Sequence, residues 1–479
     1  DFCLSRGLGD VYKRQVLGGG TAGYVAAIRA SQLGKKVAIV EKSLLGGTCL
    51  HKGCIPTKAL LKSAEVNHTI KNAHTFGIDV NHFKINFPKI LERKDAIVKQ
   101  LHEGVNQLMK HHHIDIYNGI GRIMGTSIFS PQSGTISVEY EDGESDILPN
   151  KNVLIATGSS PQSLPFIKFD HKQILSSDDI LRLNTLPQRL AIIGGGVIGL
   201  EFASLMNDLG TDVVVIEAND RVLPTESTQV AALLKEELTN RGVTFYENIQ
   251  LTKDHFNQTD KGVTINISDE PVQFDKVLIA IGRKPNTNDI GLNNTQIKTS
   301  DAGHIITNAY QQTEDKHIYA AGDCIGQLQL AHVGSKEAIV AVEHMFDCSP
   351  IPINYDLIPK CVYTNPEIAS IGKNLEQAKK AGIKAKSIKV PFKAIGKAII
   401  EDVTQSKGFC EMVVNKDDDE IIGLNMIGPH VTELINEISL LQFMNGSSLE
   451  LGLTTHAHPS LSDVVMELGL KANGQAIHV

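Results

Sequence analysis

The stretch Val16–Gly23 reads VLGGGTAG, in which a short apolar run leads directly into a glycine-rich turn. A helical segment, Tyr24–Leu33, follows the turn, and the next apolar run, Val37–Glu41, ends in an acid. Glycines in such a turn let the backbone approach a pyrophosphate at a helix N-terminus, and the acid binds a ribose hydroxyl. This order predicts a dinucleotide-binding unit; an empty glycine turn that packs helix on strand is the alternative. The motif glycines, spaced as G-x-G-x-x-G, are Gly18, Gly20 and Gly23.

A second copy of this unit lies further along the chain, and its features recur at one constant offset. The strand Leu190–Ile193 precedes it, Gly210 repeats Gly34 at the end of the helix, and Glu217 repeats Glu41. Two such units in one chain predict two bound dinucleotides. A carboxylate accepts a hydrogen bond from a 2′-hydroxyl and repels a 2′-phosphate, so Glu217, with no arginine directly after it, favours NAD over NADP. The motif glycines of the second copy are Gly194, Gly196 and Gly199.

The segment Gly46–Lys58 reads GGTCLHKGCIPTK and holds two cysteines, Cys49 and Cys54. In an ideal helix, Cα atoms five positions apart are separated by about 7.5 Å along the axis, whereas a disulfide holds them at about 5.5–6 Å. If the two cysteines pair, the backbone between them must depart from regular helix, which Gly53 permits, and Pro56 suits the first turn of the next helix. A loop this short adds little stability when it is cross-linked, so the pair is better suited to opening and closing.

Composition excludes several classes of protein. The chain has 479 residues and a net charge of −8, which argues against nucleic acid as the partner. No apolar run approaches the roughly 20 residues of a membrane span, and seven cysteines in so long a chain do not make a secreted disulfide framework. With no secretory signal, we expect a cytoplasmic protein.

Residues 1–15 do not fit the strand that should precede the first glycine turn. Lys13-Arg14-Gln15 stand where a buried parallel strand should be apolar. We expect a non-native leader here. A short, exposed start of the strand is the alternative.

Two similar segments, each an apolar strand that ends in a glycine, lie before and after the second unit and predict the domain boundaries. They are Val153–Gly158 and Val277–Gly282. We expect an α/β fold with segments 1–152, 153–281 and 282–349, followed by an α+β domain at 350–479 that has no glycine-rich phosphate turn. A further strand, Ile318–Asp323, ends in Gly-Asp. Spacing alone supports a functional role for this pair and a plain β-turn equally.

Near the end of the chain, His458 precedes Pro459 and Asp463 lies in the first turn of the helix that follows. An acid there can hold a histidine ring in one tautomer and stabilise its cation. The alternative is helix capping, because Ser460-x-x-Asp463 resembles a capping box. Spacing alone leaves both interpretations open.

We expect no metal site. The triplet His111-His112-His113 is interpreted as a solvated helix end, because consecutive residues do not converge on one helix face. The remaining cysteines have no paired spacing and are interpreted as structural thiols: Cys3, Cys324, Cys348, Cys361 and Cys410.

Taken together and in this order, the motifs resemble those of the flavoprotein disulfide reductases over residues 16–479. The resemblance is greatest to those members that oxidise dihydrolipoyl groups. Among these, the chain is most similar to the enzymes that serve branched-chain 2-oxoacid dehydrogenase complexes. The family motifs are the cysteine segment, both glycine turns, Ala320–Asp323, Leu330–His332 and the His-Pro ending. The narrower similarity is carried by Leu50–Lys52, Ile128–Pro131 and Gly474–Val479.

The resemblance implies that the first unit binds FAD and that segment 282–349 belongs to the same FAD-binding domain. It implies that the second unit binds NAD and that residues 350–479 form the interface of a homodimer. It implies active sites shared between subunits, and a pair, Lys58 and Glu201, beside the flavin. The implied FAD contacts are Gly18, Gly20, Gly23, Glu41, Thr48, Lys58, Gly121, Asp323 and Ala331. The implied NAD contacts are Gly194, Gly196, Gly199, Glu217 and Gly282.

The resemblance also implies roles for four catalytic residues. Cys49 exchanges with the substrate, Cys54 faces the flavin, and His458 of the partner subunit is the base. Asp463 orients that base, although the family has Glu at this position, one methylene longer. The implied partner is a lipoyl-bearing acyltransferase of a 2-oxoacid dehydrogenase complex.

Other members of the family are the first rivals. Glu217 argues against an NADP-dependent glutathione reductase, Cys410 as the last cysteine argues against a C-terminal thiol pair, and the Cys49–Cys54 spacing argues against a transhydrogenase. The non-enzyme alternative is a docking subunit that is held on the acyltransferase core and is catalytically weak.

Overall fold

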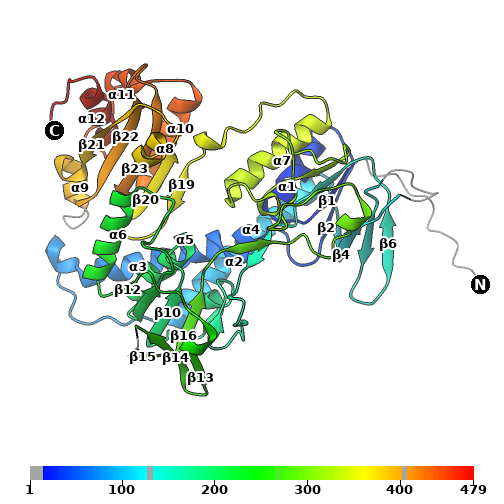
Figure 1. The fold of residues 1–479 in the computed structure, drawn as a ribbon, viewed down its shortest axis with the longest axis horizontal. Coiled ribbons are helices and arrows are strands. Elements are labelled where there is room, and N and C mark those ends of the chain that lie inside the picture. The colour runs from blue at the N-terminus through cyan, green and yellow to red at the C-terminus, as the bar shows by residue number, and fades with distance from the viewer. Residues whose placement is uncertain (1–13, 127–132, 269, 402–406) are drawn as a thin grey trace, which may run out of the picture. The chain divides into compact units, whose positions relative to one another are not determined.

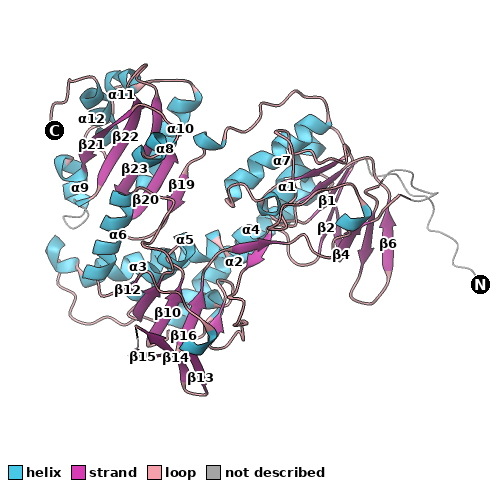
Figure 2. Ribbon diagram, viewed as in Figure 1, coloured by secondary structure: helices cyan, strands magenta, loops and turns pink. Residues whose placement is uncertain are grey.

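A computed structural model describes residues 14–126, 133–268, 270–401 and 407–479 (Figures 1 and 2). The chain forms two compact units. The first unit comprises the chain up to residue 59 with 91–162 and 282–353, and the second comprises 60–90, 163–281 and 354–479. Among the described residues, no helix is long and apolar enough to cross a membrane.

The first unit is built on a five-stranded parallel sheet in the order β18-β7-β1-β2-β3. The short apolar runs of the sequence form its central strands, and helices α1 and α7 pack on it through small residues such as Ala26 and Ala341. A separate antiparallel sheet consists of β4, β5 and β6. The strands are β1 (Arg14–Leu17), β2 (Val37–Glu41), β3 (Asp115–Asn118), β4 (Ile120–Ile123), β5 (Ile136–Glu139), β6 (Ser145–Leu148), β7 (Val153–Ile155) and β18 (Ile318–Ala320), and the helices are α1 (Thr21–Gln32), α2 (Gly47–Lys52), α4 (Phe87–His111) and α7 (Ala331–Met345).

Strand β1 begins at Arg14, earlier than its apolar run. Gln15 is fully buried in it, and the side-chain amide of Asn150 donates a hydrogen bond of 2.7 Å to the Gln15 side-chain oxygen. The polar side chain is tolerated because its hydrogen-bonding capacity is met inside the protein. Residues 14 and 15 thus belong to the fold, and the rest of the expected leader lies outside the described residues.

The second unit repeats this architecture in the sheet β12-β11-β10-β16-β9, which is parallel throughout. Strand β7 pairs with β1 and β18, so residues 153–162 lie with the first unit and not with the second as the sequence predicted. The elements are β9 (Ile174–Leu175), β10 (Arg189–Ile193), α5 (Val197–Asp208), β11 (Asp212–Ile216), α6 (Thr228–Asn240), β12 (Thr244–Tyr246) and β16 (Lys276–Ile279), with an antiparallel sheet of β13 (Phe256–Thr259), β14 (Gly262–Ile267) and β15 (Glu270–Phe274).

The C-terminal part of the second unit is an antiparallel sheet in the order β19-β20-β23-β22-β21 with helices packed on it. Its core is apolar, with Met412, Leu424, Ile435 and Leu468 fully buried. The predicted α+β domain is confirmed. Its elements are β19 (Lys360–Val362), β20 (Glu367–Gly372), α8 (Leu375–Lys380), β21 (Ala385–Pro391), α9 (Gly396–Glu401), β22 (Phe409–Asn415), β23 (Ile421–Gly428), α10 (Val431–Phe443), α11 (Ser448–Leu453) and α12 (Asp463–Ala472).

The buried residue Asp208 holds the C-terminal half of helix α3 (Cys54–Lys71) within the second unit. Asp208 accepts two hydrogen bonds from Nη1 of Arg241, at 2.8 and 3.1 Å. Its backbone carbonyl accepts from Asn67 and Lys71 of α3, at 2.6 and 3.2 Å. Burial raises the pKa of Asp208, and the Arg241 charge opposes that rise.

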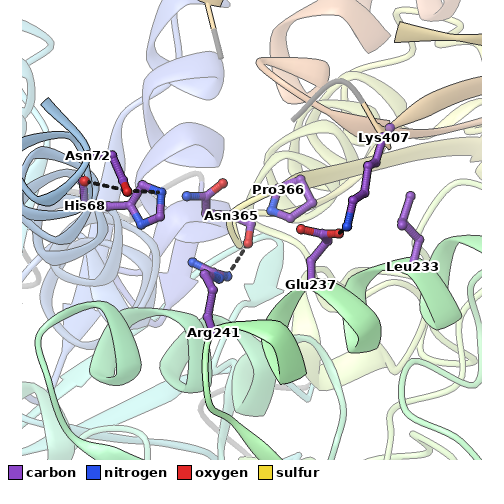
Figure 3. Close-up of a pocket in the computed structure, with 9 residues that line it drawn as sticks. His68, Asn72, Leu233, Glu237, Arg241, Asn365, Pro366 and Lys407 are labelled. Carbon is purple, nitrogen blue, oxygen red and sulfur yellow. Dashed lines mark hydrogen bonds and ion pairs between the residues drawn. The ribbon is translucent and has the colours of Figure 1, made fainter. Parts of the chain in front are cut away.

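A pocket of about 180 Å³ is lined in part by Arg241, the partner of Asp208 (Figure 3). Arg241, which is paired with Asp208, also donates to the carbonyl of Asn365, and Lys407 pairs with Glu237 at 2.8 Å. Because these two cations are each matched by an acid, the pocket has little net charge with which to attract a nucleotide. We assign it a structural role.

Replacing Arg241 with Leu leaves Asp208 buried without its principal counter-charge, so we expect a loss of about 3–5 kcal/mol of stability. Thermal unfolding followed by circular dichroism measures the effect, and Asp208→Asn in the Arg241→Leu background should recover part of it. Lys384→Ala, which breaks an exposed ion pair with Asp417, is the control and should cost less than about 1 kcal/mol. Equal losses of stability in Arg241→Leu and Lys384→Ala would contradict a structural role for the Arg241–Asp208 pair.

Candidate functional site

The first glycine turn, between β1 and α1, is shaped by close backbone contacts. Gly18 has a φ of +105°, and a Cβ at this position would lie 2.3 Å from the carbonyl oxygen of Ala156. A Cβ at Gly23 would lie 1.8 Å from the carbonyl oxygen of Gly18. At Gly20, by contrast, the nearest atom to such a Cβ would be 3.8 Å away. The outer glycines therefore allow the packing, and the middle glycine faces space that a phosphate can enter.

The second glycine turn, between β10 and α5, repeats this pattern. Gly194 has a φ of +108°, and a Cβ at Gly199 would lie 2.0 Å from the carbonyl oxygen of Gly194. No heavy atom of the described residues lies within 4 Å of a Cβ built at Gly196. Gly282, at the end of the neighbouring strand, has a φ of +126° and equally open surroundings among the described residues.

Each turn is paired with the acid at the end of its second strand. Oε2 of Glu41 accepts from the backbone N–H of Gly19 at 2.6 Å, and Oε2 of Glu217 accepts from that of Gly195 at 2.5 Å. Asn219 donates to Oε1 of Glu217 through its backbone at 2.8 Å and its side chain at 2.6 Å. Both acids are therefore positioned beside a glycine turn, as hydrogen bonding to a ribose requires, and both turns fit a dinucleotide.

Asp323 follows β18 at the start of a short 3-10 helix and is held from two sides. Ser159 donates to its carboxylate, and Arg283 donates to the same Ser159 hydroxyl at 2.7 Å. Glu337 of α7 is almost fully buried and accepts from the backbone N–H of Gly322 at 2.7 Å. The sequence did not single out Glu337, Ser159 or Arg283, and no local pattern in it marks them.

Four other expected cofactor residues lie in the first unit. Thr48 is in α2, Lys58 is in the second turn of α3, and Ala331 begins α7. Gly121 is in β4, where a Cβ would lie 2.4 Å from the Leu17 side chain, so packing against β1 requires the absence of a side chain there.

The two cysteines lie on either side of a break between helices. Helix α2 ends at Lys52, Gly53 has non-helical dihedrals, and α3 begins at Cys54, so the predicted departure from regular helix is confirmed. Both cysteines are partly exposed. A hydrogen bond to Cys54 and burial raise the pKa of the Cys49 thiol, and the Lys58 charge opposes this rise. In the reduced pair, therefore, Cys49 loses its proton less readily than an ordinary cysteine thiol.

His458 and Asp463 are in direct contact in the second unit. Nδ1 of His458 lies 2.9 Å from Oδ2 of Asp463, and the histidine side chain is 78% exposed while the aspartate side chain is 10% exposed. The same Oδ2 accepts from the Ser460 backbone N–H at 3.4 Å, but the buried Ser460 hydroxyl makes no hydrogen bond within the described protein. The reciprocal capping box is therefore absent here, and the shorter acid reaches the ring.

The predicted residues fall into both units. Cys49, Cys54 and Lys58 belong to the first unit. Glu201, whose Oε1 accepts from the Tyr363 backbone at 3.0 Å, and His458 belong to the second. The pairing of Lys58 with Glu201 thus stays a prediction. Within the described ranges, no group of three His, Cys, Asp or Glu side chains is arranged to hold a metal ion.

Comparisons with known proteins agree with this geometry. The family model for pyridine nucleotide-disulphide oxidoreductases matches residues 12–338, and the model for the dimerisation domain of that family matches residues 358–468. A dihydrolipoyl dehydrogenase of Bacillus subtilis is 48% identical over 98% of this chain and 99% of the relative, and one of Chlamydia muridarum is 36% identical over the same shares. The crystal structure of LpdA from Mycobacterium tuberculosis superposes with a TM-score of 0.89 at 27% identity, covering 96% of this chain and 99% of that one.

A methyl group at Gly196 fills the open space of the second turn without a clash, whereas one at Gly199 collides with the backbone. We expect Gly196→Ala to leave thermal stability unchanged and to weaken NADH binding about tenfold, equivalent to about 1.4 kcal/mol. Gly199→Ala should lower stability as well. Calorimetric titration with NADH and thermal melting measure the two effects, and unchanged NADH affinity in Gly196→Ala would show that phosphate does not approach there.

Proposed function

The chain belongs to the pyridine nucleotide-disulphide oxidoreductase family, and we propose that it acts as a dihydrolipoyl dehydrogenase that works through Cys49 and Cys54. The observation that carries this proposal is the attachment of the cysteine segment to the first glycine turn. Gly46 donates its backbone N–H to the carbonyl of Gly19 at 2.8 Å, and Gly46 forms a β-bridge with Gly20. The cysteine pair therefore starts directly at the dinucleotide turn.

The enzyme uses FAD and NAD and is a homodimer. When bound, FAD would supply the two-electron redox chemistry that links the reduced cysteine pair to NAD⁺. In our proposal, the turn at Gly18, Gly20 and Gly23 with Glu41 holds FAD, supported by Thr48, Lys58, Gly121, Asp323 and Ala331. The turn at Gly194, Gly196 and Gly199, with Glu217 and Gly282, holds NAD. The close backbone packing and the open middle glycine of each turn support this assignment.

The substrate reaction is thiol–disulfide exchange. His458 of the partner subunit removes a proton from one dihydrolipoyl thiol, because the thiolate is the attacking species. The thiolate attacks Sγ of Cys49, which breaks the Cys49–Cys54 disulfide and leaves Cys54 as a thiolate. His458, which is exposed, releases the first proton to solvent and then takes the proton of the second substrate thiol, which attacks the substrate sulfur of the mixed disulfide. Cys49 is released, the lipoyl group is oxidised, and two electrons remain in the protein thiols.

The His458–Asp463 contact suits this base. A carboxylate that accepts from Nδ1–H leaves Nε2 as the free, basic nitrogen and stabilises the imidazolium that forms. The imidazole is exposed, as it must be to act on a substrate attached to another protein. In our proposal each active site is shared between the two subunits of the dimer.

The proposed partner is a lipoyl-bearing acyltransferase of a 2-oxoacid dehydrogenase complex. The names of the relatives and the redox pair support this substrate, and the segment Leu50–Lys52 supports a complex for branched-chain substrates. We place the enzyme in the cytoplasm, where a reducing environment allows the pair to cycle.

The activity itself has a direct test. The purified protein should be yellow, and anaerobic addition of dihydrolipoamide should produce a long-wavelength absorption band and, with NAD⁺, NADH. A colourless protein, or one that dihydrolipoamide does not reduce, would favour the docking-subunit alternative.

Variants of the dyad test the roles of its two members. We expect His458→Gln to lower kcat by about 10²–10⁴-fold, the range for loss of a general base. Asp463→Ala should lower kcat by about tenfold or more, because the ring loses its orienting acceptor. Asp463→Glu keeps the carboxylate and should stay close to the unmodified rate. Steady-state kinetics with dihydrolipoamide measure all three, and unmodified rates in Asp463→Ala would remove the acid from the mechanism.

A further inference from the structure

Two histidines meet beside the cysteine segment, and the proposed mechanism uses neither. His51 is in α2, between Cys49 and Cys54, and His102 is on α4. Nε2 of His51 lies 2.8 Å from the carbonyl oxygen of Leu45, and Nδ1 of His102 lies 3.0 Å from the same oxygen. The two rings meet edge to face with their centroids 5.1 Å apart. One backbone carbonyl therefore receives two imidazoles from different helices.

The hydrogen bonds define the protonation of His102. The side-chain amide of Asn106 lies 3.0 Å from Nε2 of His102, and an amide nitrogen can only donate. Nε2 of His102 therefore accepts, so the ring proton is on Nδ1 and points at Leu45. In this arrangement His102 is neutral and is a donor to the carbonyl.

His51 has a matching arrangement. Its Nε2 must carry a proton to donate to the carbonyl of Leu45. Burial lowers the pKa of His51, and the neighbouring His102 and Lys52 lower it further, while the Leu45 carbonyl and Glu41 act in the opposite direction. A neutral His51 avoids placing a charge against the ring of His102.

The shared carbonyl lies at a sensitive point of the chain. Leu45 is buried and immediately precedes Gly46, whose N–H bonds to Gly19. Its side chain shares one apolar core with Leu50 of α2 and Met109 of α4. A displacement of this peptide would move the start of α2, and Cys49 is in the first turn of that helix.

We infer that His51 and His102 are positioning residues that hold the Leu45 carbonyl between α2 and α4 and so fix Cys49 relative to the first glycine turn. We call this pair the histidine clasp. The inference rests on the proposed function only in that Cys49 is taken as the exchanging thiol. In the clasp, two donors bond to one carbonyl. When one donor is removed, the other still partly restrains the Leu45 peptide.

The test uses the dimeric holoenzyme. Each variant that removes a hydrogen-bond donor is compared with a variant that keeps a donor at the same position. His51→Leu and His102→Leu remove the donors, whereas His51→Gln and His102→Asn place an amide N–H near the positions of Nε2 and Nδ1. Amide hydrogen exchange in a peptide covering residues 45–49 reports the restraint itself. Stopped-flow reduction by dihydrolipoamide without NAD⁺ reports its effect on Cys49. His111→Leu, an exposed histidine at the end of the same helix α4, is the control.

We expect each leucine variant to raise amide exchange and to slow reduction roughly threefold to tenfold, the range for one net hydrogen bond. The double leucine variant should exceed the product of the single effects, because the remaining donor partly compensates in each single variant. His51→Gln, His102→Asn and His111→Leu should stay near the unmodified protein. Unchanged exchange in the leucine variants, or failure of the amide variants to restore it, would overturn the clasp. If dihydrolipoamide fails to reduce even the unmodified enzyme, the proposed function fails, while the exchange data still decide on the clasp.

Discussion

Backbone contact between two glycine turns is the constraint on which the active region of the first unit depends. The turn at Gly46 and Gly47 lies against the turn at Gly19 and Gly20, and a Cβ at Gly47 would lie only 2.5 Å from the Cα of Gly20. Gly46 and Gly47 also have positive φ angles of +105° and +59°, which residues with side chains rarely adopt. Glycine is thus required here for both conformation and space, and Cys49 inherits its position from this contact.

The second unit contains the same type of glycine turn as the first. It also has the same acid bonded to a turn amide. One architecture therefore provides two dinucleotide sites, and the cysteines give only the first of them a route to thiol chemistry. The C-terminal part of the second unit, an antiparallel sheet with helices, is the dimerisation domain and carries the His458–Asp463 pair.

Local sequence patterns predicted those features that depend on local geometry. The two glycine units, the break in the helix at Gly53 and the C-terminal α+β domain all follow from short-range rules of spacing and propensity. The burial of Gln15 and the pairing of β7 could not be predicted, because each depends on a partner far away in the sequence. For the same reason the sequence did not reveal Glu337 or the meeting of His51 with His102. Capping and the histidine dyad had equal support at Asp463 from spacing alone. In the described structure Asp463 contacts the His458 ring and also accepts from the Ser460 backbone N–H.

The way in which Glu41 and Glu217 are held has a consequence for how such a chain can change over generations. Each carboxylate is fixed by amides of its own repeat, and neither relies on the other copy. A substitution at one acid therefore alters the nucleotide preference of one site and leaves its counterpart untouched. The repeated unit thus offers two binding modules that substitutions could adjust independently of each other.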